Sequence, residues 1–333
     1  MMTGVKKLFN AMIYLDEKNI REIGINWREC AETISKAVLC LHNRDAVQPM
    51  KPYLRFKNLQ NRIIAMPAFL GGSFDVAGIK WIASFPENTK ENLPRASSVV
   101  ILNNSETGRI LSVIHTSLLR VIRTASVSAS VIKCFLEARQ YKKITVGIVG
   151  WGPIGQYHLK MCEEMLGDKI SKILLYDLKN VDLKNIDFDK KEKIVIAKSW
   201  LEVYTESDIF ITCTVSKERY IDKKPKLGSL LLNVSLRDYK LDIFPFVKNS
   251  IIVDDWDEAC RENTDIETFH KDKGLRKADT KSIVDIVVND CLKSYAKNDP
   301  IMFNPMGMAI FDIAIAKYYL DLAKKKNIGQ MLE

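Results

Sequence analysis

The feature that most constrains this chain is a glycine-rich turn between an apolar run and a helical pattern. The run 143–149 is rich in aliphatic and β-branched residues, as in a buried parallel strand. It ends in G-x-G-x-x-G, at Gly150, Gly152 and Gly155, and a helical pattern over 156–166 follows. In that context the glycines permit a tight turn, a close approach of backbone to a pyrophosphate, and packing of helix on strand. The motif predicts a Rossmann-type dinucleotide site. The alternative is a glycine-rich turn in another kind of α/β domain.

An acidic residue supports the dinucleotide interpretation. The apolar run 173–176 predicts a second strand, and Asp177 follows it, 22 residues after Gly155. A carboxylate at that position can accept hydrogen bonds from an adenosine ribose and repel a 2′-phosphate, which favours NAD over NADP. Lys179 is the one nearby residue that argues for NADP.

Further strands are predicted after this pair. Together with the first two they make six strands separated by helices, as in a doubly wound, mostly parallel sheet. Ligands of such sheets bind at the carboxyl ends of the strands, so Thr214 and Ser235 are candidate cofactor contacts. The additional strands are expected at 194–197, 208–215, 230–235 and 251–253.

The first 115 residues predict a different, β-rich unit with helical segments at 16–44. A helix over 117–138 leads into the Rossmann-like part, and a last helix over 307–326 is expected to fold back on the N-terminal unit. The predicted fold is therefore α/β. It has a Rossmann domain at 121–304 and a discontinuous α+β substrate-binding and dimerisation domain, formed by 1–120 with 305–333. The expected strands of that domain are 12–15, 62–67, 76–82, 97–103 and 110–114.

Several charged residues occupy positions where chemistry is plausible. Lys80 lies inside an apolar strand, on the face opposite Ile79 and Trp81. A lysine facing a cleft loses solvation, so that its pKa falls and it can act as an acid or base; the alternative is an edge-strand lysine that faces water. Met66 and Trp81 have the character of core residues, although Met66 is kept as a substrate-contact candidate.

Two arginines and an aspartate complete this candidate set. Arg55 and Arg123 could clamp a carboxylate or a phosphate, or lie on the surface. Asp238 follows a predicted strand end, where a catalytic carboxylate could act, and where a turn aspartate is equally common.

Composition excludes several classes of protein. The 333 residues carry a net charge of +9, but the lysines are scattered without a basic stripe interleaved with aromatic residues, so no nucleic-acid partner is expected. Seven cysteines form no CxxC pair, and four histidines form no HxxxH or HExxH pattern. We therefore expect reduced thiols in a cytoplasmic protein and no metal site. No apolar run is long enough to span a membrane. The first residues favour a leader into a strand over a signal peptide.

Several of these segments resemble the ornithine cyclodeaminase/μ-crystallin family over nearly the whole chain. They are RIIAMPAFLGG, GIKWI, LRVIRTASVSA, GIVGWGPIG, DIFITCTV, NVSLRD and NPMGMAIFD. Within the family, VQPMKPYLR, RASSVVILN and FNPMGMAI resemble the siderophore-pathway branch, the N-(2-amino-2-carboxyethyl)-L-glutamate dehydrogenases. The cyclodeaminase subgroup has a glycine-rich segment around its aspartate. Here the corresponding segment, residues 235–240, is SLRDYK, which argues against ornithine cyclisation.

The resemblance implies a homodimer and a set of site residues. Lys80 and Asp238 are implied as catalytic, and Arg55, Met66, Lys80 and Arg123 as substrate contacts. Expected cofactor contacts are Ser97, Arg123, Gly150, Gly152, Pro153, Ile154, Gly155, Asp177, Thr214, Val234, Ser235 and Met306.

The implied reaction is oxidative hydrolysis of a glutamate–diaminopropionate conjugate. Hydride passes to NAD, and water then releases 2-oxoglutarate and L-2,3-diaminopropionate. The sequence leaves two alternatives open. One is another activity of the family, namely alanine dehydrogenase, ketimine reductase or cyclodeaminase. The other is a nucleotide- or ligand-binding protein without turnover.

Overall fold

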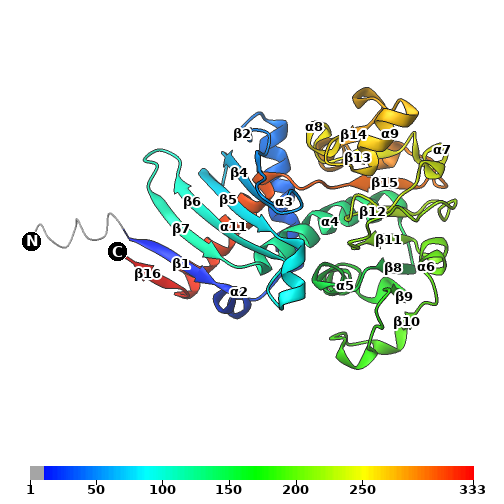
Figure 1. Cartoon of the computed structure of the whole chain (residues 1–333), viewed down its shortest axis with the longest axis horizontal. Coiled ribbons are helices and arrows are strands. Elements are labelled where there is room, and N and C mark those ends of the chain that lie inside the picture. Colours follow the sequence, from blue (N-terminus) through cyan, green and yellow to red (C-terminus); the bar gives the residue numbers. More distant parts are fainter. Residues whose placement is uncertain (1–10) are drawn as a thin grey trace, which may run out of the picture. The chain divides into compact units, whose positions relative to one another are not determined.

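The computed structural model describes residues 11–333, which form two compact units (Figure 1). The described part of the first unit is 11–124 together with 308–333, and the second unit is 125–307. The predicted leader lies almost wholly outside the described residues. Among the described residues, no helix is both long and apolar enough to cross a membrane.

The first unit is built on an eight-stranded, mostly antiparallel sheet. Its order is β16-β1-β7-β6-β5-β4-β2, and β3 also pairs with β4. Only β1 and β7 run parallel among these pairs. The strands are β1 (Met12–Asp16), β2 (Ala46–Val47), β3 (Tyr53–Leu54), β4 (Arg62–Leu70), β5 (Val76–Ser84), β6 (Ala96–Asn104), β7 (Ile110–His115) and β16 (Gln330–Leu332).

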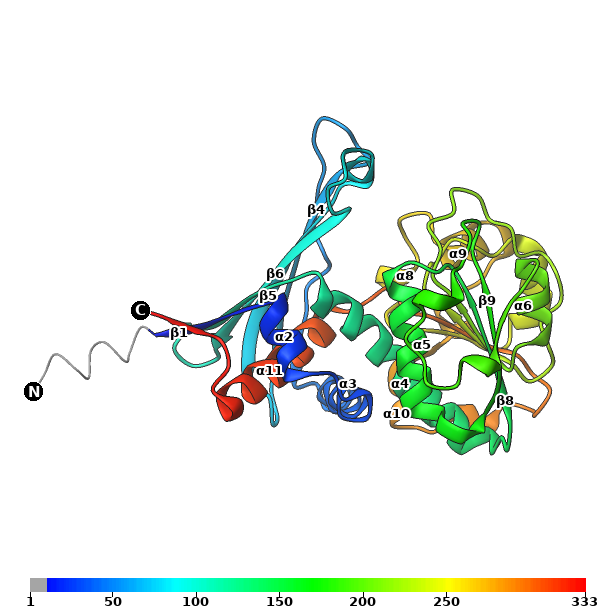
Figure 2. The same ribbon diagram turned by 90° about the horizontal axis from the view of Figure 1, so that it is seen from below.

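Three helices, α2 (Glu17–Ile23), α3 (Trp27–His42) and α11 (Ala309–Lys326), cover one face of this sheet (Figure 2). Asp16 caps α2, because its side chain accepts a hydrogen bond from the backbone N–H of Asn19. The predicted helical region 16–44 is interrupted at Gly24, whose φ of 85° ends α2. The last helix, α11, packs on α3, β4 and β5.

Gly78 in β5 brings α11 close to the sheet. A Cβ at this position would stand 2.9 Å from Ile313 Cδ1 of α11 and 2.4 Å from the Ile101 carbonyl oxygen. No larger residue fits that space, so the glycine permits a short approach of helix to strand. The polar residues described below, Lys80 on β5 and Asp312 on α11, are neighbours of this contact.

The second unit is a doubly wound sheet in which every strand pair is parallel. The α/β class with a Rossmann-type sheet is confirmed, but the predicted strand number is corrected from six to eight, in the order β10-β9-β8-β11-β12-β15-β13-β14. The two missed strands are short: β14 has two residues, and the apolar part of β15 is only three residues, 301–303, directly after Pro300. The strands are β8 (Ile144–Val149), β9 (Ile170–Tyr176), β10 (Ile194–Ile196), β11 (Ile209–Thr212), β12 (Leu230–Asn233), β13 (Ile251–Val253), β14 (Lys281–Ser282) and β15 (Ile301–Asn304).

Helices lie on both faces of this sheet. In Figure 2, α5 lies on one side of β8 and β9, and α6 lies on the other. The strands β8, β11, β12, β13 and β15 carry almost wholly buried side chains, as expected for a parallel sheet covered on both faces. The α-helices that begin before or within this unit are α4 (Leu118–Arg139), α5 (Pro153–Leu166), α6 (Trp200–Glu206), α7 (Phe244–Val247), α8 (Trp256–Ala259), α9 (Asp265–Lys273) and α10 (Ile283–Val287).

Candidate functional site

The glycine-rich turn between β8 and α5 has the geometry of a phosphate cradle. Gly150 has φ 98°, and a Cβ there would lie 2.6 Å from the backbone of Cys213. A Cβ on Gly155 would stand 2.1 Å from the Gly150 carbonyl oxygen, which is where helix packs on turn. Gly152, in contrast, has open space within 4 Å of its Cβ position and directly precedes the first turn of α5. The space that a side chain would fill therefore lies beside unpaired helix N–H groups, which suits a pyrophosphate.

Asp177 ends β9 next to this turn, and both of its carboxylate oxygens accept backbone hydrogen bonds. Trp151 N–H donates to Oδ2 at 2.6 Å, and Lys179 N–H donates to Oδ1 at 2.8 Å. Each oxygen keeps a lone pair, so the carboxylate is held in one orientation and can still accept from ribose hydroxyls.

The remaining cofactor candidates of this unit gather at the same edge of the sheet. Thr214 follows β11, Val234 and Ser235 follow β12, and Met306 follows β15. Because all these strands run parallel, their carboxyl ends share one edge with the glycine-rich turn. Met306 N–H is tied to Asp254 Oδ1 at 3.0 Å. The other two cofactor candidates, Ser97 and Arg123, belong to the first unit.

Asp238 is buried in the loop after β12, with 1% of its surface exposed. Thr214 Oγ1 donates to its Oδ1 at 2.6 Å, and the backbone N–H groups of Tyr220 and Ile221 hold its carbonyl oxygen at 2.9 Å each. Burial raises the pKa of this carboxyl group, and the hydroxyls of Thr214, Ser235 and Thr212 partly oppose the rise. A carboxyl group with a raised pKa suits proton transfer, and the catalytic role of Asp238 stays a prediction.

Asp265, which the sequence reasoning missed, holds the Asp238 loop in place. Its Oδ2 accepts from the N–H groups of Asp238 (3.1 Å) and Tyr239 (3.2 Å), while its own N–H donates to the Leu236 carbonyl at 2.8 Å. Arg219 Nε binds Oδ1 at 2.7 Å. Burial raises the pKa of Asp265 to about 6, against the opposing effect of Arg219. Its position at the first residue of a short helix gave no sequence signal beyond a common acidic first turn.

Lys80 occupies the helix-covered face of the first unit, with 2% of its surface exposed. It lies opposite Met66 of β4 and Val100 of β6, so β5 is an internal strand. The alternative of an edge lysine facing water is therefore excluded by the strand order. Met66 is buried on the same face, whereas Trp81 is 43% exposed on the other, so the prediction of Trp81 as a core residue was wrong.

Lys80 forms a buried cluster with Asp312 of α11 and Arg123 of α4. Lys80 Nζ and Arg123 Nε both lie 3.0 Å from Asp312 Oδ1. Burial, with the positive charge of Arg123, lowers the pKa of Lys80 to about 7, although Asp312 opposes the change. Although burial raises the pKa of Asp312, the charges of Arg123 and Lys80 outweigh this effect and hold it below its usual value. The clue to Asp312 in the sequence is one acid within the apolar run 308–316.

The structure separates the other predicted residues of this unit from the cluster. Arg55 is exposed after β3, where it donates to the Leu59 carbonyl at 2.9 Å, and it makes no hydrogen bond or ion pair with Lys80, Arg123 or Asp312. Ser97 is exposed, and strand alternation puts it on the sheet face opposite Lys80. The roles predicted for both residues stay predictions.

The chain is similar to known proteins over nearly its whole length. Residues 15–327 match the model of the ornithine cyclodeaminase/mu-crystallin family. N-((2S)-2-amino-2-carboxyethyl)-L-glutamate dehydrogenase of Staphylococcus aureus is 32% identical, over 96% of this chain and 98% of that protein.

Two solved structures share the fold over nearly their whole length. Δ1-pyrroline-2-carboxylate reductase of Thermococcus litoralis, in complex with NADH and L-proline, has a TM-score of 0.84 and 24% identity, and covers 96% of this chain and 99% of that one. An archaeal alanine dehydrogenase dimer with bound NAD has a TM-score of 0.79 and 21% identity, and covers 97% and 99%. The family model, the 32% relative and the fold all agree with the resemblance seen in the sequence, and this chain belongs to the ornithine cyclodeaminase/mu-crystallin family.

Proposed function

We propose that the chain is an NAD-dependent dehydrogenase that oxidatively hydrolyses N-(2-amino-2-carboxyethyl)-L-glutamate. The substrate, NAD⁺ and water would yield L-2,3-diaminopropionate, 2-oxoglutarate, NADH and a proton. The observation that carries the proposal is the 32% identity, across 96% of the chain, with a dehydrogenase of that substrate. The two sites described above are consistent with it, one offering a dinucleotide cradle and the other a buried cationic cluster.

The second unit would hold the NAD. The turn at Gly152 and the first N–H groups of α5 suit the pyrophosphate, and Asp177 suits the adenosine ribose. The bound nicotinamide would accept the hydride from the glutamate Cα. The carboxylate of Asp177 is already fixed by two backbone donors, so no reorganisation is needed to receive a 2′-hydroxyl, and a 2′-phosphate would meet its negative charge.

The cluster of the first unit would recognise and activate the amino-acid part. The Nε of Arg123 donates to Asp312, so its two terminal nitrogens remain for a substrate carboxylate. Lys80, with a pKa of about 7, can take or give a proton near neutrality, as departure of the amine and attack of water require. Asp238 is the second candidate acid or base. Help of this kind contributes roughly 10²–10⁴ in rate.

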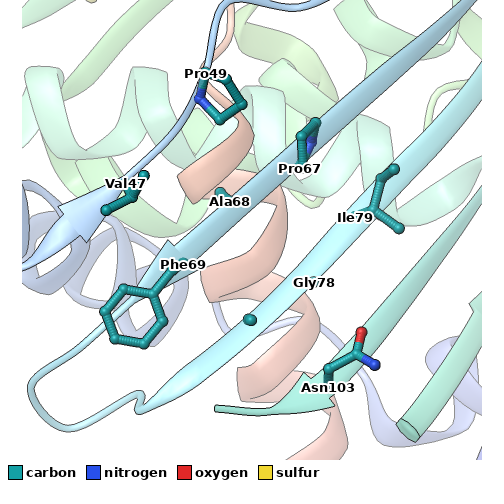
Figure 3. Close-up of a pocket in the computed structure, with 9 residues that line it drawn as sticks. Val47, Pro49, Pro67, Ala68, Phe69, Gly78, Ile79 and Asn103 are labelled. Carbon is teal, nitrogen blue, oxygen red and sulfur yellow. The ribbon is translucent and has the colours of Figure 1, made fainter. Parts of the chain in front are cut away.

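We also propose that the protein is a homodimer that associates through the outer face of the first unit's sheet. A groove of about 350 Å³ opens on this face (Figure 3), and apolar side chains dominate its lining. Trp81 and Val47, 43% and 64% exposed, add to the apolar surface. Such a patch marks an interface, and the archaeal alanine dehydrogenase relative is a dimer. The lining residues are Val47, Pro49, Pro67, Ala68, Phe69, Ala77, Gly78, Ile79 and Asn103.

The activity is tested by offering purified protein and NAD the conjugate, and in parallel ornithine, L-alanine or L-proline. NADH and 2-oxoglutarate should appear together, in equal amounts, with the conjugate alone. Turnover of alanine, proline or ornithine in its place would move the chain to another activity of the family. Binding of NADH without turnover of any substrate would favour a ligand-binding role.

A variant connects the activity to the cluster. Lys80→Met should abolish turnover of the conjugate and leave NADH affinity unchanged, because Lys80 lies outside the nucleotide-binding unit. Loss of NADH affinity in this variant would contradict the assignment of Lys80 to the substrate.

A further inference from the structure

A second arginine, Arg120, belongs to the same buried region as Arg123 but has no role in the sequence-based site. The two lie three residues apart on α4, so they share one face of the helix. Nε of Arg120 is fully buried and makes no hydrogen bond with any residue of 11–333. Arg123, in contrast, is anchored by Asp312 through its Nε. The two guanidinium groups are therefore held differently.

Charge in this region is unbalanced. Asp312 is the carboxylate that neutralises Lys80 and Arg123, and both bind the same oxygen, Oδ1. Its Oδ2 accepts no hydrogen bond from a described residue. Burial and the neighbouring charges of Arg123 and Arg95 lower the pKa of Arg120 and outweigh the opposing charge of Asp312, so its surroundings are more cationic than anionic. A charged side chain whose buried nitrogen lacks an acceptor is destabilising, and an anion bound to that nitrogen removes the penalty.

The chemistry of the unpaired group defines the missing anion. A guanidinium offers Nε and a terminal nitrogen as a planar pair of donors, which matches the two oxygens of a carboxylate. The Nε of Arg123 is used by Asp312, so only its terminal nitrogens remain, whereas the buried Nε of Arg120 has no acceptor. The two arginines are thus prepared for two separate carboxylates.

We propose that Arg120 is a specificity-determining residue that binds a second carboxylate of the substrate and so selects polycarboxylate amino acids over monocarboxylate ones. The inference rests on the proposed function in that the conjugate carries more than one carboxylate. It adds a residue and a selection rule that separate this chain from an enzyme for alanine or proline.

The binding test uses simple anions, so that its result does not depend on turnover. Glutarate, a dicarboxylate, and butyrate, a monocarboxylate, are titrated into the full-length protein in the presence of NADH, with calorimetric detection. Arg120→Gln should weaken glutarate binding by about 10- to 100-fold, the loss expected for a charge-assisted hydrogen-bonded pair, and leave butyrate unchanged. Arg120→Lys should recover part of the affinity, since it keeps the charge and loses the fork. Equal losses for both anions, or none for either, would overturn the proposal.

Arg139→Gln is the matched control. Arg139 lies on the same helix and also has a buried Nε without a hydrogen bond, but it belongs to the other unit and donates to the Asp299 carbonyl. Its replacement should leave glutarate binding intact. If Arg120→Gln does not fold, Arg120→Lys alone decides the matter, because unchanged glutarate affinity in that variant would count against a bidentate contact.

Kinetics separate this inference from the proposed function. If the conjugate is a substrate, Arg120→Gln should raise its KM far more than it lowers kcat, and an unchanged KM would refute the role of Arg120. If the conjugate is not turned over but Arg120→Gln still loses glutarate selectively, the proposed function fails and the second carboxylate site stands.

Discussion

At the scale of single residues, two glycines of the glycine-rich turn have different expected effects. Replacing Gly155 should lower stability, and replacing Gly152 should weaken NADH binding. Gly155→Ala places a Cβ 2.1 Å from a backbone oxygen, so it should lower the free energy of unfolding by several kcal/mol, roughly the cost of severe overpacking. Gly152→Ala meets open space at φ −75°, so it should change stability by less than about 0.5 kcal/mol. NADH affinity of Gly152→Ala should nevertheless fall by about tenfold or more, because the methyl group fills the pyrophosphate position. Chemical denaturation and NADH fluorescence titration measure the two effects. Unaltered NADH binding would place the pyrophosphate elsewhere.

The depressed pKa of Lys80 predicts a pH dependence of stability. The pKa is about 7 in the folded protein against an ordinary value of 10.5 for lysine, so between these values the unfolded chain binds more protons. The free energy of unfolding should therefore rise with pH from about 7 upward, by as much as about 1.4 kcal/mol per pH unit from this group. Urea denaturation of the wild type and of Lys80→Met at pH 7, 8 and 9 isolates the effect, since all other groups are common to both proteins. Parallel curves for the two proteins would show that Lys80 keeps an ordinary pKa.

At the scale of elements, the loop after β12 is positioned by the start of α9. Asp265→Asn removes the charge that Arg219 binds and weakens the acceptor for the Asp238 and Tyr239 amides. Hydrogen exchange of these two amides should accelerate at least about tenfold, with a stability loss of about 1–3 kcal/mol. Glu258→Gln is the control, because it breaks a comparable ion pair to Arg261 in the same unit. Faster exchange in both variants alike would indicate general loosening and not a specific clamp.

Some helices and strands could be predicted from the local sequence pattern alone, and others could not. The helix α3 was predicted from apolar positions at helical spacing, and the strands β8, β9, β11 and β12 from continuous apolar runs. Strands β14 and β15 were missed, because β14 has two residues and the apolar part of β15 is only three residues, 301–303, directly after Pro300. Both gain strand geometry mainly from their neighbours.

At the scale of the whole molecule, the outer sheet face predicts self-association. Ile79→Lys places a charge in the apolar groove without touching the helix-covered face, so the proposed dimer should dissociate, with a mass near that of a monomer by light scattering. Val195→Lys, a charge on the half-exposed edge strand β10 of the other unit, should leave the mass unchanged. A wild-type protein that is monomeric at micromolar concentration would contradict the interface.

Sequence by itself determined the glycine-rich edge that we propose binds NAD, because its parts are contiguous. The strand, the three glycines, the helix and Asp177 fall within 35 residues, and backbone conformation alone brings them together. Only the tertiary structure decided the composition of the cationic cluster. Asp312 is 232 residues from Lys80, and it reaches that side chain because α11 packs on β5 over Gly78. Such a contact depends on sheet register and helix packing. The sequence therefore shows that an acidic residue, Asp312, lies in the last helix, and the fold shows that it binds Lys80 and Arg123.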